Sequence, residues 1–257
     1  MKIVLIGAGN LATCLGRALQ LAKHEIRQVY SRTLSSAQQL ADRLNAAAVS
    51  DIEEVTKDAD LYIIAVKDSA LESVIRQLCV GREERIFVHT AGSMPMNIFS
   101  GRAKHFGVIY PMQTFSKARE VDFREIPIFL EASSESVYAE INELARSISS
   151  RIYKLNSADR RYLHLSAVWA CNFVNHCYNI SSEVLEQKCI PFSVMLPLID
   201  ETARKIHTMQ PRDAQTGPAV RYDENVIRAQ MELMGFDADS QKLYESLSVN
   251  IHKKNNK

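Results

Sequence analysis

The residues best suited to chemistry near the N-terminus are the glycines of the segment GAGNLA, residues 7–12. In the spacing G-x-G-x-x-A, Gly7 forms a tight turn, Gly9 lets the backbone approach a pyrophosphate, and Ala12 lets a helix pack on a strand. The helix N-terminus that follows presents free N–H groups and a partial positive charge. The segment predicts a dinucleotide site. The alternative is a glycine turn that serves packing alone.

A second polar group, Ser31-Arg32-Thr33, follows a predicted strand at residues 25–30. A dinucleotide fold that prefers NAD usually has Asp or Glu near this position, where the carboxylate binds the ribose hydroxyls. A guanidinium between two hydroxyls instead suits the 2′-phosphate of NADP, through charge-assisted hydrogen bonds. The sequence therefore predicts NADP as the cofactor. The alternative is a solvated loop arginine.

A third group lies on a predicted helix at residues 159–186, which contains no Lys, Arg, Asp or Glu from residue 163 to 182. At 3.6 residues per turn, one stripe of this helix carries His164, Val168, Asn172, Asn175, Asn179 and Ser182. A stripe that faces solvent normally carries charges, so the pattern predicts a helix surrounded by protein, with its polar side toward a cleft or a partner subunit. Imidazole is well suited to proton transfer near neutral pH, although a lone histidine on a helix is more often structural.

The elements that must position these groups follow from hydrophobic periodicity. Alternating strands and helices across residues 1–155 predict one doubly wound, mostly parallel Rossmann sheet of the α/β class. Its strands are expected at residues 2–6, 25–30, 46–49, 61–66, 85–89, 105–110, 126–131 and 151–155. Short helices are expected at residues 51–60 and 70–78, the second capped by Asp68 or Ser69.

From residue 156 the pattern changes to helices alone, which predicts an all-helical second domain over residues 156–257. Its helices are expected at residues 159–186, 192–209, 223–234 and 238–251, with Asp223 as the N-cap of the third. The Thr216-Gly217-Pro218 turn before that helix is a rigid loop of the kind that can face a site.

Composition excludes several classes of function. A net charge of +1 offers no basic field for nucleic acid and no polybasic membrane patch. The five cysteines lack the spacing of a zinc site or a disulfide framework. We therefore expect no bound metal, and we expect the protein to reside in the reducing cytoplasm. No segment is apolar enough to span a bilayer, and the first apolar run is too short for a signal peptide.

A family resemblance rests on several of these segments together. The glycine turn, Ser31-Arg32-Thr33, AVKD at residues 65–68, HTAGS at residues 89–93 and the helical C-terminal part resemble the pyrroline-5-carboxylate reductase and 6-phosphogluconate dehydrogenase-like superfamily. More closely, the chain resembles NADP oxidoreductases that join a Rossmann-like domain to a C-terminal helical domain of uncharacterised function. The matching segments are residues 89–93, 110–115, 164–173 and 216–223, and the Pro-x-Gln-Thr-Phe and Thr-Gly-Pro-x-x-Arg stretches are the more specific ones.

The resemblance implies a nicotinamide cofactor across the C-terminal ends of the strands and a homodimer in which the helical domain completes the site. In the hydroxyacid dehydrogenase branch, a Lys one turn before the helix Asn donates a proton to the substrate. Here Val168 stands one turn before Asn172, and His164, two turns before it, is the titratable group that could replace the lysine. The chain also lacks the glycine- and threonine-rich loop expected of a true pyrroline-5-carboxylate reductase.

The resulting hypothesis is an NADP(H)-dependent oxidoreductase that acts on a small carbonyl or imine compound. The expected cofactor contacts are Gly7, Gly9, Asn10, Leu11, Ser31, Arg32, Thr33, Val66, Lys67 and Thr90. The expected catalytic residues are His164 and Asn172, and the expected substrate contacts are Ser93, Gln113, Thr216 and Arg221, of which Arg221 suits a carboxylate. The rival hypotheses are a non-catalytic NADP(H)-binding sensor or scaffold and, more weakly, a protein for another nucleotide.

Overall fold

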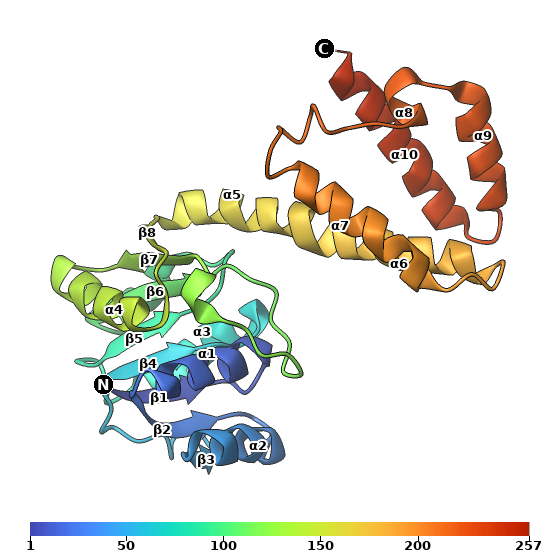
Figure 1. The fold of residues 1–257 in the computed structure, drawn as a ribbon. Coiled ribbons are helices and arrows are strands. Elements are labelled where there is room, and N and C mark those ends of the chain that lie inside the picture. The colour runs from blue at the N-terminus through green and yellow to red at the C-terminus, as the bar shows by residue number, and fades with distance from the viewer. Residues whose placement is uncertain (257) are drawn as a thin grey trace. The chain divides into compact units, whose positions relative to one another are not determined.

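The computed structural model describes residues 1–256 (Figure 1), in two compact units, Met1–Cys171 and a helical unit that begins at Asn172. The predicted boundary between residues 155 and 156 marks the end of the sheet, whereas the next helix still belongs to the first unit. As a domain boundary it stays a prediction.

The first unit is built on an eight-stranded sheet in the order β3-β2-β1-β4-β5-β6-β7-β8. All neighbouring strands are parallel except β6 and β7, so the predicted α/β, doubly wound and mostly parallel architecture is confirmed. The strands are β1 (Lys2–Ile6), β2 (Glu25–Tyr30), β3 (Ala47–Val49), β4 (Leu61–Ile64), β5 (Ile86–His89), β6 (His105–Pro111), β7 (Ile128–Ala132) and β8 (Ile152–Lys154).

Helices cover both faces of this sheet. One face carries α1 (Asn10–Leu21), α2 (Leu34–Leu44) and α4 (Glu135–Ile148), and the other carries α3 (Asp68–Leu78) and the short 3-10 helix η1 (Met96–Phe99). A second 3-10 helix, η2, spans Phe123–Glu125. Every residue of β4 and β5 is buried because helices cover both faces of the sheet, and all of these residues except His89 are hydrophobic.

The register of the parallel strands sets one functional edge. Ile6 is level with Tyr30 on one side and Ile64 on the other, and Ile64 is level with His89. The residues that follow these strand ends therefore emerge side by side at the carboxyl edge of the sheet, where open α/β sheets bind ligands.

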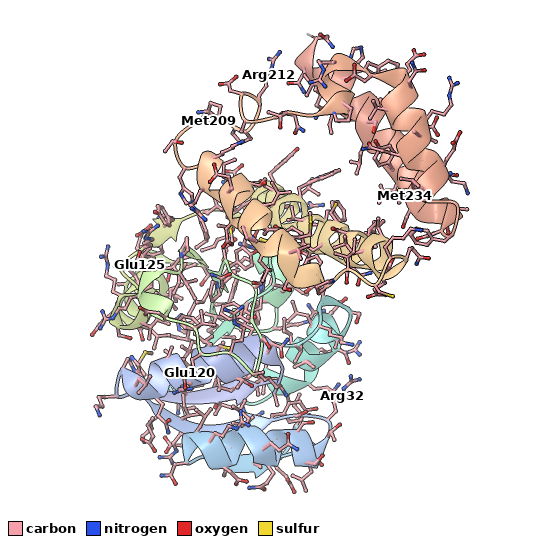
Figure 2. The ribbon with its side chains drawn as sticks, turned by 45° about the vertical axis from the view of Figure 1, so that its right-hand side comes forward. Arg32, Glu120, Glu125, Met209, Arg212 and Met234 are labelled. Carbon is pink, nitrogen blue, oxygen red and sulfur yellow. The ribbon has the colours of Figure 1, made fainter. Side chains whose placement is uncertain are left out.

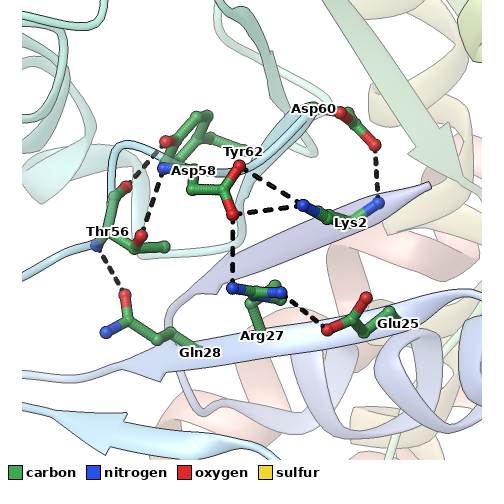
Figure 3. Close-up of polar contacts among 8 residues, drawn as sticks. All are labelled: Lys2, Glu25, Arg27, Gln28, Thr56, Asp58, Asp60 and Tyr62. Atoms are coloured by element: carbon green, nitrogen blue, oxygen red, sulfur yellow. Dashed lines mark hydrogen bonds and ion pairs between the residues drawn. The ribbon is translucent and has the colours of Figure 1, made fainter.

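The expected helix at residues 51–60 is wrong, because side chains there bond to the backbone and replace helical hydrogen bonds (Figure 3). Thr56 Oγ1 accepts from the Asp58 N–H, and the Thr56 N–H donates to Gln28 Oε1 at 2.6 Å. Asp58 also binds the ammonium of Lys2 at 3.1 Å, and this hydrogen bond holds the pKa of Asp58 below its usual range. The segment is thus fixed to β1 and β2 as a series of turns.

The long helix expected at residues 159–186 is helical throughout but not uniform. It consists of α5 (Ser157–Ala167), a π-helical segment η3 (Val168–Phe173) and α6 (Val174–Glu186). A π-turn inserts an extra residue into the helical repeat, so the uniform spacing that aligned His164 with Asn172 does not apply through residues 168–173.

The remaining helices are η4 (Phe192–Met195), α7 (Leu196–Lys205), α8 (Pro218–Arg221), α9 (Glu224–Leu233) and α10 (Ala238–Asn255). Asp223 is the N-cap residue of α9, as predicted, although its carboxylate binds Arg221 rather than the helix N–H groups. The expected cap of α3 is wrong, because α3 already begins at Asp68, which makes Lys67 its N-cap residue. No helix in the described chain is both long and apolar enough to cross a membrane.

Candidate functional site

The glycine turn has the geometry of an anion-binding site. Gly7 has a φ of 120°, and a Cβ there would lie 2.3 Å from the Ala65 carbonyl oxygen, so the turn needs glycine. Gly9 is exposed and extended, and a Cβ there would meet no atom within 4 Å. Because α1 begins at Asn10 without a side-chain cap, the N–H groups of its first turn remain open to a ligand.

The residues after β2 form the next part of the edge. Arg32 is exposed, and Figure 2 shows it at the surface of the sheet unit. In residues 1–256 it makes no ion pair with a carboxylate. The Thr33 N–H donates to Ser31 Oγ at 3.4 Å, which keeps the two hydroxyl residues in one tight turn around Arg32. The fork of donors on Arg32 is therefore available for an anionic ligand.

Val66, Lys67 and Thr90 occupy the centre of the edge. Thr90 is buried, and its N–H donates to the Ile64 carbonyl at 3.2 Å, which joins the ends of β4 and β5. Val66 is close to the turn, since its Cγ1 would lie 3.4 Å from a Cβ on Gly7. Lys67 is exposed at the start of α3. The structure thus brings Val66 beside the glycine turn and joins Thr90 to the end of the neighbouring strand β4.

His164 is held at the same edge by contacts within the first unit. Its Nδ1 lies 3.0 Å from the Tyr110 hydroxyl, and the two rings meet edge to face with centroids 5.9 Å apart. Gly92 makes room for the imidazole, because a Cβ there would lie 2.5 Å from Nδ1. Burial raises the pKa of Tyr110, so the phenol keeps its proton and can donate it to Nδ1.

Arg160, one helical turn before His164, fixes α5 to the sheet. Its guanidinium is fully buried, binds Glu131 of β7 at 2.6 Å and donates to the Met94 carbonyl at 2.6 Å. A Ser157 hydroxyl also donates to Glu131 at 2.6 Å. Sequence reasoning missed both Arg160 and Tyr110. The position of Tyr110 near the carboxyl end of a predicted strand was the available signal.

His89 is unsuited to proton transfer although it stands near this edge. Burial, with a smaller contribution from Arg160, lowers the pKa of His89 to about 3. Its Nδ1 accepts from the Ala91 N–H at 3.2 Å, and its Nε2 has no partner among the described residues. The side chain is therefore neutral and supports the loop that carries Gly92.

The predicted substrate contacts of the first unit have polar partners already. Ser93 donates to the carboxylate of Asp68, and exposed Gln113 accepts from the Thr114 N–H at 2.8 Å through Oε1. The Ser93 hydroxyl is thus oriented by Asp68, whereas the Gln113 amide nitrogen is left available to a ligand.

The other predicted residues belong to the helical unit. Asn172 is exposed in η3, Thr216 precedes α8, and Arg221 is the last residue of α8. Arg221 already binds Asp223 through two hydrogen bonds, at 2.8 and 3.2 Å, so a substrate carboxylate would compete with Asp223 for it. Gly217, between Thr216 and α8, is the N-cap residue of α8, and its φ of 107° favours glycine.

Comparison with known proteins agrees with this architecture. Residues 1–110 match a Rossmann-like domain, and residues 126–251 match a domain of unknown function, DUF2520. No protein of curated function matches the sequence. A crystal structure from Bacteroides fragilis, named as a candidate NADP oxidoreductase, shares 52% sequence identity over 98% of both chains, with a TM-score of 0.95.

Two more distant structures share the fold. The 1-pyrroline-5-carboxylate reductase of Streptococcus pyogenes is 15% identical over 98% of both chains, with a TM-score of 0.64. A reductive aminase of Aspergillus terreus, solved with NADPH, is 17% identical over 98% of this chain and 94% of the other, with a TM-score of 0.69. This chain belongs to the family that joins a Rossmann-like domain to a DUF2520 domain, as the resemblance predicted.

Proposed function

We propose that this protein is an NADP(H)-dependent oxidoreductase that acts on a small carbonyl or imine compound. The observation that carries the proposal is the joint presence, at one edge of the sheet, of an open glycine turn and a histidine fixed by Tyr110. The name of the Bacteroides fragilis relative and the NADPH complex of the reductive aminase support the same chemistry.

The residues present fit the cofactor. Gly9, Asn10 and Leu11 would hold the pyrophosphate on open N–H groups, with Gly7 forming the turn, and Ser31, Arg32 and Thr33 would hold the 2′-phosphate of NADP. Val66, Lys67 and Thr90 would border the nicotinamide ribose. When bound, the nicotinamide supplies or accepts the hydride.

His164 would transfer the proton that the reaction of the substrate requires. In the neutral imidazole, the Tyr110 O–H donates to Nδ1, which places the imidazole proton on Nε2. Nε2 is then the atom that exchanges a proton with the substrate oxygen or nitrogen when imidazole and imidazolium interconvert. Asn172, Ser93, Gln113, Thr216 and Arg221 stay proposed contacts of a small-molecule substrate.

The protein would form a homodimer, in which the helical domain of each chain contacts the other chain. In the helical unit the buried residues are Ala219, Ile227, Met234, Ser240 and Ser248. Leu196 and Leu198 of the same unit are 49% and 58% exposed, and Leu165, in the α5 helix of the first unit, is 53% exposed. So small a core within these residues favours burial against another subunit. The cysteines, all free in the structure, suit the proposed cytoplasmic location.

The alternative is an NADP(H)-binding sensor or scaffold without turnover. It is favoured by Val168, which stands where the resembling dehydrogenases have a proton-donating lysine, and by the engagement of Arg221 with Asp223. An enzyme oxidises NADPH with some member of a panel of small ketones and cyclic imines, whereas a sensor binds NADPH and consumes it with none.

Calorimetric titration with NADPH and NADH is the first test. We expect selective binding of NADPH, and Arg32→Ala should reduce NADPH affinity by roughly tenfold or more while leaving NADH affinity unchanged, since a charged hydrogen bond contributes about 1.5–3 kcal/mol. Arg76→Ala, an exposed arginine on α3, is the matched control. If neither nucleotide binds, the proposal that the protein is an NADP(H)-dependent oxidoreductase is wrong.

A further inference from the structure

A cleft of about 640 Å³ lies within the sheet unit, lined by none of the residues proposed to hold the cofactor. Its walls are α1 from Thr13 onward, the C-terminal half of α2, the loop at residues 117–124 and the last turn of α4. None of the residues proposed above to hold cofactor or substrate lines it. Its volume is in the range of small-molecule sites.

The walls of this cleft are held by contacts between elements. Gln20 of α1 donates to the Leu44 carbonyl of α2 at 2.7 Å. The loop is fixed to α1 by the Lys117 N–H, which donates to Asn10 Oδ1 at 3.3 Å, and by the Arg17–Glu120 ion pair at 2.6 Å. These contacts join α1 to α2 and to the loop, the elements that form three of the walls.

The cleft concentrates positive charge. Five cationic side chains, those of Arg17, Arg43, Lys117, Arg119 and Arg124, line it together with the carboxylates of Glu120 and Asp122. Its formal charge is thus +3, whereas the whole chain carries +1. A ligand-sized region that holds more positive charge than the entire molecule favours anions.

Most of these cations lack an internal counterion. Glu120 pairs with Arg17, and Asp122 accepts a hydrogen bond from the backbone N–H of Arg124 at 2.9 Å. Within residues 1–256, the side chains of Arg43, Lys117, Arg119 and Arg124 form no ion pair. Three arginines and a lysine therefore line one cleft without an ion pair of their own, a composition suited to a ligand with several phosphate or carboxylate groups.

We propose that this cleft binds a small multivalent anion that carries phosphate or carboxylate groups, independently of the cofactor. Buried apolar residues, Leu40, Leu44 and Phe123, also line the cleft and could contact the carbon skeleton of such a molecule. The exposed ion pair of Arg17 and Glu120 links α1 to the loop at this cleft, and Figure 2 labels Glu120.

The test is calorimetric titration of the full chain at low ionic strength with sodium tripolyphosphate and, separately, with citrate. We expect one of them to bind in a salt-dependent manner, and the preferred probe distinguishes phosphate from carboxylate chemistry. Saturating NADPH should not displace the bound probe, because the two sites share no residue.

Variants assign the binding to the cleft. The double variant Arg43→Ala/Arg119→Ala should lose at least tenfold in affinity for the probe. Both residues are exposed and without side-chain hydrogen bonds in residues 1–256, so the thermal midpoint should be retained. Arg228→Ala, an exposed arginine of α9, is the matched control and should bind as the parent does.

Three results would overturn the proposal: no binding of either probe, full affinity in the double variant, or loss of binding in Arg32→Ala or on addition of NADPH. The last result would assign the anion to the cofactor edge. A Lys117→Ala variant provides an independent second measurement on the loop side of the cleft.

Discussion

At the scale of single residues, Gly7 and Gly9 occupy the same turn for different reasons. Gly7 has a positive φ and a carbonyl oxygen where a Cβ would lie, whereas Gly9 is extended beside open space. The same substitution should therefore act on folding at one position and on binding at the other.

We expect Gly7→Ala to lower the free energy of unfolding by about 1–3 kcal/mol or more, because of backbone strain and the clash with Ala65. Gly9→Ala should leave the thermal midpoint nearly unchanged but weaken NADPH binding, since its methyl group occupies the approach of the pyrophosphate. Thermal unfolding and calorimetry measure the two effects. Equal behaviour of the two variants would contradict this division of roles.

The hydrogen bond between Tyr110 and His164 predicts which ring nitrogen of neutral His164 carries the proton. With the phenol donating to Nδ1, neutral His164 should be the Nε2–H tautomer, which nitrogen-15 chemical shifts of the histidine-labelled protein report. Tyr110→Phe should give a mixture of tautomers. A Nδ1–H tautomer in the unmodified protein would contradict the proposed proton route, whatever the substrate is.

At the scale of elements, Arg160 and Arg151 provide a matched pair. Each binds a glutamate at 2.6 Å, but the Arg160 side chain is 1% exposed and that of Arg151 is 53% exposed. Arg160→Ala should cost about 3–5 kcal/mol of unfolding free energy, because Glu131 is left with an unpaired and poorly solvated charge. Arg151→Ala should cost about 1 kcal/mol or less. Urea unfolding measures both, and similar values would contradict the role of Arg160 in anchoring α5.

Buried His89 at the end of β5 should make the sheet sensitive to acid. Its pKa is about 3 in the folded protein, below the ordinary value of 6.5, so the unfolded chain binds the additional proton between these two pH values. Stability should therefore fall as the pH drops from 6.5 toward 3, by on the order of a few kcal/mol. His89→Asn should flatten this part of the stability curve, while a slope equal to that of the parent would contradict the assignment.

At the scale of the whole molecule, the helical region lacks the core that an independent unit of its size needs, which underlies the proposed dimer. Leu165→Lys, in α5 near the start of the segment without charges, should dissociate the dimer at micromolar concentration. Val80→Lys is the control, since Val80 is 66% exposed at the end of α3. Light scattering measures the molecular mass in solution. A monomeric mass for the unmodified protein would contradict the proposed dimer.

The sheet could be predicted because its signals are local. Continuous apolar runs such as residues 61–64, separated by glycine turns and amphipathic helices, specify a doubly wound fold without knowledge of any long-range contact. The expected helix at residues 51–60 failed for the opposite reason. The Thr56 N–H in this segment donates to Gln28 Oε1. Gln28 lies 28 residues away in the chain, so no local sequence pattern reveals this hydrogen bond.

The sequence by itself determined the glycine turn, the position of Arg32 after β2, and the family, because motif spacing and apolar periodicity are properties of neighbouring residues. Tertiary structure decided the surroundings of His164. Tyr110, Gly92 and Arg160 come from a strand, a loop and a helix that are separated in the chain and meet only when the sheet orders them. The positive cleft is likewise a product of packing, since α1, α2 and the loop at residues 117–124 contribute its charges from three separate segments.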